Sequence, residues 1–150
     1  MMQVALETVT PQLIAAVTDS VQIKDIPTAW EPAIYQVKAF LAGRADLGSG
    51  RQVFLYHHPT QREAAMKIDF GVEVAKSFSD AGAVKCLSTP EGRVATAVHL
   101  GPLNGLPQTH MAIHQWCAVN KHAIGGFSWE TYEWGDGRDP VKTEVRYLLR

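Results

Sequence analysis

The sequence predicts an α+β domain in which two related halves each lay an amphipathic helix on a mostly antiparallel sheet. Three observations lead to this prediction. The chain has 150 residues, of which 46% are hydrophobic and 19% charged, a balance that suits one globular domain with its own core. Its halves repeat one pattern of strand, strand, helix, strand, strand. Segments rich in β-branched and aromatic residues outnumber the two helix-like segments.

The repeat is visible in short matching segments. Residues 4–11 and 83–90 share a pattern that ends in Thr-Pro, and residues 15–18 correspond to residues 96–99 further along. We therefore expect one domain over residues 1–150, with internal halves of about 1–78 and 79–150. A boundary near residues 76–82 is the natural place for the chain to pass from one half to the other.

In the first half, a capping box predicts where the helix begins. Thr28 is followed by Glu31 three residues later, which favours a helix from about Ala29 with Pro32 harmless in its first turn. Apolar residues then recur at helical spacing until Gly43, which should end the helix.

In the second half, Asn104 is the candidate N-cap, and the pair Gly125-Gly126 is expected to end the helix. Because both helices are amphipathic, each needs a sheet to cover. The strand candidates are residues 52–57, 65–74, 93–100, 127–134 and 143–149.

Charge and hydropathy exclude several classes of protein. Fourteen Lys and Arg against fifteen Asp and Glu give a net charge of −1, so no basic surplus is present to hold a nucleic-acid backbone. No apolar run approaches the length of a membrane span, and no secretory leader is evident. We expect a soluble, cytoplasmic protein. The two cysteines, Cys86 and Cys117, show no disulfide or zinc pattern and carry little functional information.

Alternation along the last two predicted strands places carboxylates among aromatic rings. The apolar residues of the strand 143–149 share one side and should meet a helix, which leaves Glu144 on the other side. In the preceding strand Glu130 shares a side with Tyr132 and Trp134. We expect Glu130 and Glu144 both to point away from the helices, onto one acidic and aromatic face.

Two aromatic residues of the first half would extend this face. Phe54 and Tyr56 lie on one side of their strand, and Tyr56 holds the place that Tyr132 has in the second half. A groove between the halves, walled by such rings and with a carboxylate at its floor, would attract an apolar cation. It would also suit general acid or base chemistry. The plain alternative is a strand that shows its Glu to solvent, which is the usual position of an isolated Glu.

The histidines give weaker signals. His110 and His114 are four residues apart on a predicted helix and could hold a metal ion, but no further ligand is indicated, so we interpret them as surface or capping residues and predict no metal site. His57 and His58 are interpreted as residues that lead into a turn. No phosphate loop, dinucleotide fingerprint or Ser/His/Asp order is present, and no cofactor is predicted. The tryptophans expected in the core are Trp30, Trp116 and Trp129.

Four motifs of the second half carry a family resemblance: GRVATAVHLGPLNGLP at 92–107, IHQW at 113–116, WETY at 129–132 and TEVRY at 143–147. In order and spacing they resemble the gyrase-inhibitor-like (GyrI-like) small-molecule-binding domain, also called the AraC-type effector-binding domain. The segments 54–56 and 68–74 of the first half fit the same pattern, so the resemblance spans nearly the whole chain.

The resemblance implies a fold of two strand–helix–strand–strand units related by pseudo-twofold symmetry, with two helices on one face of the sheet and a ligand groove between the halves. Such domains are the drug- or effector-sensing halves of AraC-type and MerR-type regulators, and some stand-alone members are hydrolases of cyclopropane-containing xenobiotics. The Glu and Tyr of the family's Trp-Glu-x-Tyr motif correspond to Glu130 and Tyr132, and its last-strand Glu to Glu144. Leu103 replaces a usual Tyr ahead of the second helix, which predicts a smaller or less aromatic ligand.

Three functional hypotheses from different classes follow. The first is a stand-alone module that binds a drug-like, apolar and cationic small molecule. The second is a hydrolase of electrophilic xenobiotics in which Glu144 or Glu130 activates water and Tyr132 donates a proton. The third is a protein-interaction role for an exposed sheet face. The absence of a helix-turn-helix means that this chain does not read DNA itself, so a separate transcription regulator is the candidate protein partner. The ligand-contacting residues expected are Glu130, Tyr132, Trp134, Phe54, Tyr56 and Glu144.

Overall fold

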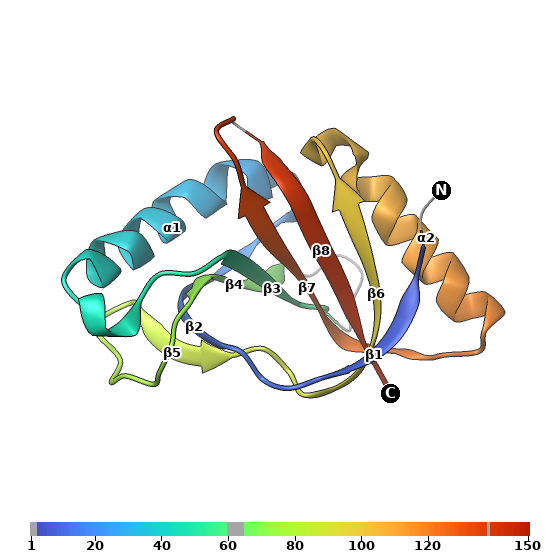
Figure 1. The fold of residues 1–150 in the computed structure, drawn as a ribbon, viewed down its shortest axis with the longest axis horizontal. Helices are drawn as coiled ribbons and strands as arrows, with labels where there is room; N and C mark the ends of the chain where they lie inside the picture. The colour runs from blue at the N-terminus through green and yellow to red at the C-terminus, as the bar shows by residue number, and fades with distance from the viewer. Residues whose placement is uncertain (1–2, 60–64, 138) are drawn as a thin grey trace. The chain divides into compact units, whose positions relative to one another are not determined.

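The computed structural model describes residues 3–59, 65–137 and 139–150 (Figure 1). The chain divides into two compact units. We call the first the α1 unit, which runs over Pro11–Thr89, and the second the α2 unit, which combines Met1–Thr10 with Pro90–Arg150. Each unit contains four strands and one α-helix among its described residues, and the strand pairs within each unit are antiparallel. The predicted α+β fold class is confirmed.

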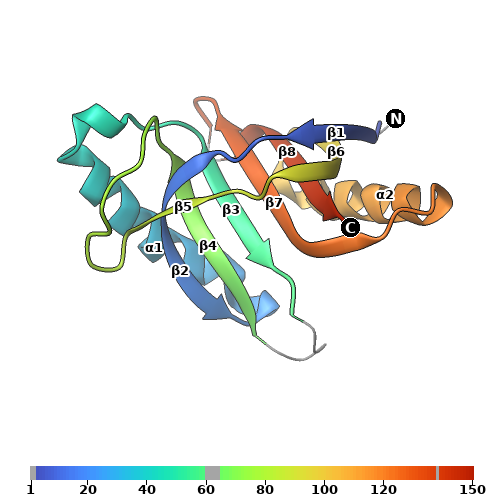
Figure 2. The ribbon, with the colours of Figure 1, turned by 90° about the horizontal axis from the view of Figure 1, so that it is seen from below.

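The α1 unit carries its helix on the inner strands of its sheet. Helix α1 covers Ile26–Ala42 and packs on β2 and β4, with Ala33, Ile34, Val37 and Leu41 buried at the contact. Short 3-10 turns at Ile23–Asp25 and Ala45–Leu47 flank the helix. The strands lie in the order β3 (Gln52–His57), β4 (Met66–Glu73), β2 (Leu13–Val21) and β5 (Lys85–Ser88), as Figure 2 shows.

The α2 unit repeats this plan. Helix α2 covers Leu106–Val119, follows a 3-10 turn at Leu103–Gly105, and packs on β6 and β8. The strands lie in the order β1 (Ala5–Val9), β6 (Gly92–Leu100), β8 (Pro140–Leu149) and β7 (Ile124–Trp134).

The compact units differ from the contiguous halves expected at residues 1–78 and 79–150. The first strand of the chain, β1, pairs with β6, and β5 pairs with β2, so each repeat contributes its opening strand to the sheet that contains the other repeat's helix. The chain crosses from one unit to the other at Thr10–Pro11 and at Thr89–Pro90. Both crossings are therefore the Thr-Pro pairs that mark the sequence repeat, and the loop at residues 76–82 lies inside the α1 unit.

The registers of the two sheets show the repeat in detail. In the α1 unit Asp69 lies opposite Thr18 on one neighbouring strand and Leu55 on the other. In the α2 unit Glu144 lies opposite Val98 and Thr131 in the same way. Each unit therefore has a carboxylate at the equivalent position of its fourth repeat strand.

Helix α1 begins earlier than its capping box predicts. It starts at Ile26, and the Thr28 hydroxyl donates to the Asp25 carbonyl at 3.0 Å instead of capping a free N–H. Pro32, expected in the first turn, therefore lies inside the helix, where it lacks the N–H that would bond the carbonyl four residues earlier. The predicted end is confirmed, because Gly43 is the C-cap.

Helix α2 departs from the prediction at both ends. It begins after Gly105, one residue beyond the expected cap Asn104, and ends at Val119. The pair Gly125-Gly126 lies in β7, where the register with β8 shifts. A Cβ on Gly125 would stand 3.1 Å from the Leu148 carbonyl oxygen, so glycine there permits the close approach of the two strands.

The core of the α2 unit lies between its helix and one face of its sheet. Ile113 and Cys117 of α2 pack with the alternate residues Val145, Tyr147 and Leu149 of β8. The predicted orientation of this strand is confirmed. It also defines two faces, because residues that share a side with Val145 point toward α2 and the others point away. Within the described residues, no helix is long and apolar enough to cross a membrane.

Candidate functional site

Glu130 is a buried carboxylate beneath helix α2. Its strand partner is Val145, and directly opposed residues of antiparallel strands share a face, so Glu130 points toward the helix. Only 4% of the residue is exposed. The expectation that Glu130 points away from the helices is wrong. Because an ionised carboxylate in such a place must be hydrogen-bonded, its partners decide what it can do.

Two side chains hold this carboxylate. Oε2 lies 2.6 Å from Nε2 of His110 on α2, and Oε1 accepts a hydrogen bond from the hydroxyl of Tyr132, two residues along β7. The second ring nitrogen of His110, Nδ1, lies 2.6 Å from the Tyr147 hydroxyl on β8. We call these four residues, Glu130, Tyr132, His110 and Tyr147, the α2 polar cluster.

The state of Tyr147 sets the direction of these hydrogen bonds. Burial, and then the charge of Glu130, raise the pKa of Tyr147 far above its usual range, so the phenol keeps its proton. Its O–H can therefore donate to Nδ1 of His110. A neutral His110 then carries its proton on Nε2 and donates it to Glu130. In this state His110 and Tyr132 donate to Glu130 as neutral groups.

His114 lies beside the cluster on the next turn of α2. Its ring meets the Tyr147 ring edge-on, with centroids 4.8 Å apart. Burial, and then the charge of His110, lower the pKa of His114. His110 and His114 are thus one helical turn apart in the structure as well, but both ring nitrogens of His110 face protein oxygens.

Two buried hydroxyls near the cluster lack partners. Thr143 lies opposite Tyr132 in the sheet, and Thr109 lies on the buried side of α2 next to His110. Both residues are 0% exposed, and neither Oγ1 has a hydrogen-bond partner among the described residues. The space beneath α2 therefore retains unused hydrogen-bonding capacity beside Tyr132.

Glu144 lies on the other face of the same sheet. Its strand partner on β7 is Thr131, the residue that follows Glu130 in the chain. Its Oε1 accepts from Arg146 Nη1 at 3.1 Å, and its Oε2 lies 3.8 Å from Lys142 Nζ. The prediction that Glu130 and Glu144 share a face is therefore wrong. Glu130 shares the face of its partner Val145, and Glu144 is the neighbour of Val145 along β8, so it points to the opposite face.

The face away from α2 contains an open groove of about 700 Å³. Its walls include the charged residues Glu7, Glu144 and Arg146 and the exposed apolar residues Val98 and Leu100. Glu130 does not line it. The groove and the α2 polar cluster are therefore separate features of one unit.

A model of the GyrI-like small-molecule-binding domain matches residues 2–149. The chain belongs to this family. No curated protein matches it. The family resemblance drawn from the sequence motifs is confirmed, and the WETY motif that carried part of it is the segment that supplies Glu130 and Tyr132.

Solved structures share the fold of this GyrI-like chain. The C-terminal domain of EcmrR has a TM-score of 0.76 at 19% identity, over 100% of this chain and 98% of that one. SAV2435 bound to tetraphenylphosphonium has a TM-score of 0.73 at 13% identity, over 99% and 94%. A hydrolase from Listeria innocua has a TM-score of 0.68 at 12% identity, over 99% and 92%. In the EcmrR–DNA complex the match covers only 57% of the EcmrR chain.

The aromatic residues expected as groove walls occupy different settings in the GyrI-like fold. Phe54 is 6% exposed and packs between Trp30 of α1 and Phe70 of β4, as a core ring. Tyr56 is half-buried on the same strand. Trp134 is 40% exposed and follows a register shift at the end of β7.

Of the tryptophans expected in the core, Trp129 is 3% exposed and Trp30 packs on Phe54, whereas Trp116 stacks on His122 and is only partly buried. The burial of these rings comes from packing within each unit. Their contacts with a ligand stay a prediction.

Sequence reasoning missed His110 and Tyr147. The four-residue spacing of His110 and His114 drew attention to metal binding, and Tyr147 was counted only as an apolar residue. A usable signal was present: His110 shares the helical stripe of Leu106, Ile113 and Cys117, which places it on the buried side of α2.

A second buried carboxylate was also missed, in the α1 unit. Asp69 is 3% exposed and accepts a hydrogen bond from the Thr18 hydroxyl at 2.5 Å, while its Oδ2 lies 2.7 Å from Nε2 of His57. Interpreting His57 only as a residue before a turn overlooked this pair. The repeat supplied the signal, since Asp69 is the register equivalent of Glu144.

Proposed function

We propose that this GyrI-like chain binds a small, apolar monocation, with the Glu130 carboxylate as its counter-charge. The observation that carries the proposal is the α2 polar cluster, which holds a carboxylate that is 4% exposed in contact with Tyr132 and His110. A buried carboxylate attracts a cation, because opposite charges attract more strongly in a medium of low dielectric constant than in water.

The chemistry of the ligand follows from the same cluster. Each oxygen of Glu130 already accepts one hydrogen bond, so a cation whose charge is spread over apolar groups can approach without donors of its own. Aromatic ring faces stabilise such a cation further. We include Tyr132 and Trp134 as the proposed ring contacts, and Thr143 and Thr109 as hydroxyls available to polar groups of the ligand.

Two comparisons support the cation class. The family to which the chain belongs is one of small-molecule-binding domains. One neighbour in fold, SAV2435, is bound to tetraphenylphosphonium, a cation with no hydrogen-bond donor. Glu144 is left out of the proposed site, because it lies on the opposite face and is engaged by Arg146 and Lys142.

The test is calorimetric binding of tetraphenylphosphonium to the wild type, Glu130→Gln and Glu144→Gln. Glu130→Gln keeps the shape and an acceptor but removes the charge. We expect it to weaken binding by about 2 kcal/mol or more, roughly 30-fold in Kd. Glu144→Gln is the matched control and should bind as the wild type does. Equal affinity of Glu130→Gln and the wild type would remove Glu130 from the site.

A hydrolase is the second candidate, and the Tyr132–Glu130 hydrogen bond is the observation that favours it. Glu130 would accept a proton from water as the water oxygen bonds to an electrophilic ring carbon, and Tyr132 would give its proton to the carbon released when the carbon–carbon bond breaks. The phenolate would be reprotonated through Glu130, so the sum is the addition of one water. A hydrolase from Listeria innocua has the same fold.

This second candidate has a separate readout. The wild type and Tyr132→Phe are incubated with a cyclopropane-bearing electrophile, and mass spectrometry follows the gain of one water. Turnover by the wild type that Tyr132→Phe loses would support the hydrolase. Binding of the electrophile without turnover would leave only the binding role.

The proposed protein partner is a transcription regulator that supplies a DNA-binding half. The length of EcmrR beyond the matched region supports this arrangement, since it is present in a complex with DNA. Such a regulator acts on the chromosome, so we place the chain in the cytoplasm. Co-purification with a DNA-binding protein that depends on tetraphenylphosphonium would test the partnership.

A further inference from the structure

The partly exposed His110 side chain contacts the buried Glu130 carboxylate. Its side chain is 25% exposed, compared with 6% for that of Glu130, and it is the residue of the α2 polar cluster that comes from the helix. Both of its ring nitrogens contact oxygens of the cluster, Nε2 to Glu130 and Nδ1 to Tyr147, each at 2.6 Å. A change in the charge of His110 therefore acts directly on the Glu130 carboxylate.

The cluster can hold His110 in either charge state. When the ring is neutral, the Tyr147 O–H donates to Nδ1. When the ring is protonated, both nitrogens donate, and the Tyr147 oxygen must accept from Nδ1. A phenol oxygen can do so, and its own hydrogen can turn to Ser128, the residue across the strand pair with which Tyr147 also hydrogen-bonds. Neither state leaves an unsatisfied group.

Titratable groups of α2, β6, β7 and β8 lie around His110. From α2 itself comes His114, whose pKa is lowered by burial and by the charge of His110. From β8, Tyr147 keeps its proton because its pKa is raised. From β6, His99 turns Nε2 to the Pro102 carbonyl at 2.7 Å. From β7 come Tyr132 and the carboxylate of Glu130, which lies 2.6 Å from the His110 ring.

We propose that a proton on His110 and a bound cation compete for Glu130, so that binding of the cation expels the proton. A protonated His110 forms an ion pair with Glu130, which cancels the counter-charge and repels a second positive charge. A cation near Glu130 disfavours the imidazolium for the same reason. The two equilibria are linked, and each must shift the other by the same factor. The inference rests on the proposed function and adds control by pH to it.

The linkage fixes the sign of the pH dependence. The free protein holds the proton on His110 more tightly than the complex does, so between the two titration midpoints binding releases a proton. Affinity for the cation therefore falls as pH falls through the range in which histidine titrates, by up to about tenfold per pH unit. Above that range the affinity is constant.

The experiment is calorimetry of tetraphenylphosphonium binding near pH 5.5 and pH 8, the approximate limits of histidine titration, in two buffers of different ionisation enthalpy. In the wild type we expect roughly one proton released per cation at the lower pH and none at the higher. His110→Gln keeps a side-chain donor for Glu130 but does not titrate, so it should bind without proton release at either pH. His122→Gln, which changes a histidine stacked on Trp116, should behave as the wild type does.

A second measurement needs no variant. The chemical shift of the His110 ring in the wild type is followed against pH by NMR, without and with saturating tetraphenylphosphonium, and its midpoint should fall when the cation is present. Cation binding with no proton release and an unmoved His110 midpoint would overturn the inference while leaving the binding function intact. No binding by the wild type at either pH would overturn both.

Discussion

Nε2 of His110 lies 2.6 Å from Oε2 of Glu130, and this contact joins helix α2 to strand β7 by a polar bond beside the apolar core of the unit. The same ring reaches β8 through Tyr147. The helix is thereby positioned by a carboxylate that is also the centre of the proposed site. Changes in the charge or bonding of this cluster should alter stability and ligand affinity together.

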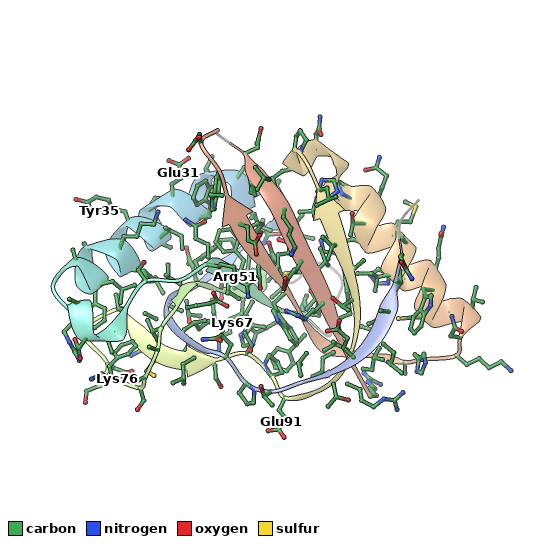
Figure 3. All side chains as sticks on the ribbon, in the orientation of Figure 1. Glu31, Tyr35, Arg51, Lys67, Lys76 and Glu91 are labelled. Atoms are coloured by element: carbon green, nitrogen blue, oxygen red, sulfur yellow. The ribbon has the colours of Figure 1, made fainter. Side chains whose placement is uncertain are left out.

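Tyr147→Phe removes the hydroxyl bonded to Nδ1 of His110 while keeping the buried ring. We expect the free energy of unfolding to fall by about 1 to 2 kcal/mol, because a partner of the buried imidazole is lost. Urea denaturation measures the change. Tyr35→Phe is the control, since Tyr35 is 75% exposed and extends outward from α1 (Figure 3). A loss of the same size in both variants would contradict the role given to the Tyr147 hydroxyl.

Thr143→Val replaces a buried hydroxyl that has no hydrogen-bond partner with a methyl group of similar size. Removing an unsatisfied polar atom should raise the free energy of unfolding, by about 1 kcal/mol. Thr18→Val should do the opposite, because the Thr18 hydroxyl donates to the buried Asp69. Denaturant titration of both variants checks the contrast. Destabilisation by Thr143→Val would mean that its hydroxyl is satisfied in solution.

His114→Gln should make the protein less sensitive to mild acid. The pKa of His114 is lowered in the folded state, first by burial, so the unfolded chain binds more protons at this site between the folded value and the unfolded value of about 6.5. Its contribution to stability is complete above that pH and is lost as pH falls below it. The unfolding free energy of the wild type should therefore fall more steeply with decreasing pH than that of the variant. A constant difference across the range would contradict the lowered value.

Pro32→Ala should stabilise helix α1. The proline lies inside the helix and removes a backbone hydrogen bond, so alanine should add about 1 to 3 kcal/mol to the free energy of unfolding. Pro27→Ala is the matched control, because Pro27 is in the first turn, where an N–H has no helical partner. Thermal or urea unfolding compares the two. An equal response at both positions would show that the helix does not depend on the missing bond.

The spacing of apolar residues and the positions of helix-ending and turn residues made much of each unit predictable from sequence. The strand Gln52–His57 has the predicted bounds, the alternation of β8 sends Val145, Tyr147 and Leu149 to the helix as expected, and Gly43 ends α1. These features depend on residues close together in the chain, so local patterns were sufficient for them.

The candidate site needed information that local patterns lack. Whether Glu130 faces the helix depends on the register of β7 against β8, and a shift of one residue sends every side chain of a strand to the other face. That register is set partly by the irregularity between Ile124 and Ser128, where glycine permits a close backbone approach. The partnership of His110 with Glu130 needed both this register and the rotation of α2.

The exchange of opening strands also determines the order in which the molecule can be completed during translation. Residues 11–89 form a continuous stretch, so the α1 unit has all its strands before the rest is made. Strand β1 is synthesised before the α1 unit, yet its partner begins at Gly92. A nascent chain that stops before that point therefore carries the α1 unit together with a β1 segment that lacks its partner, and synthesis of β6 is the step that gives β1 its place in a sheet.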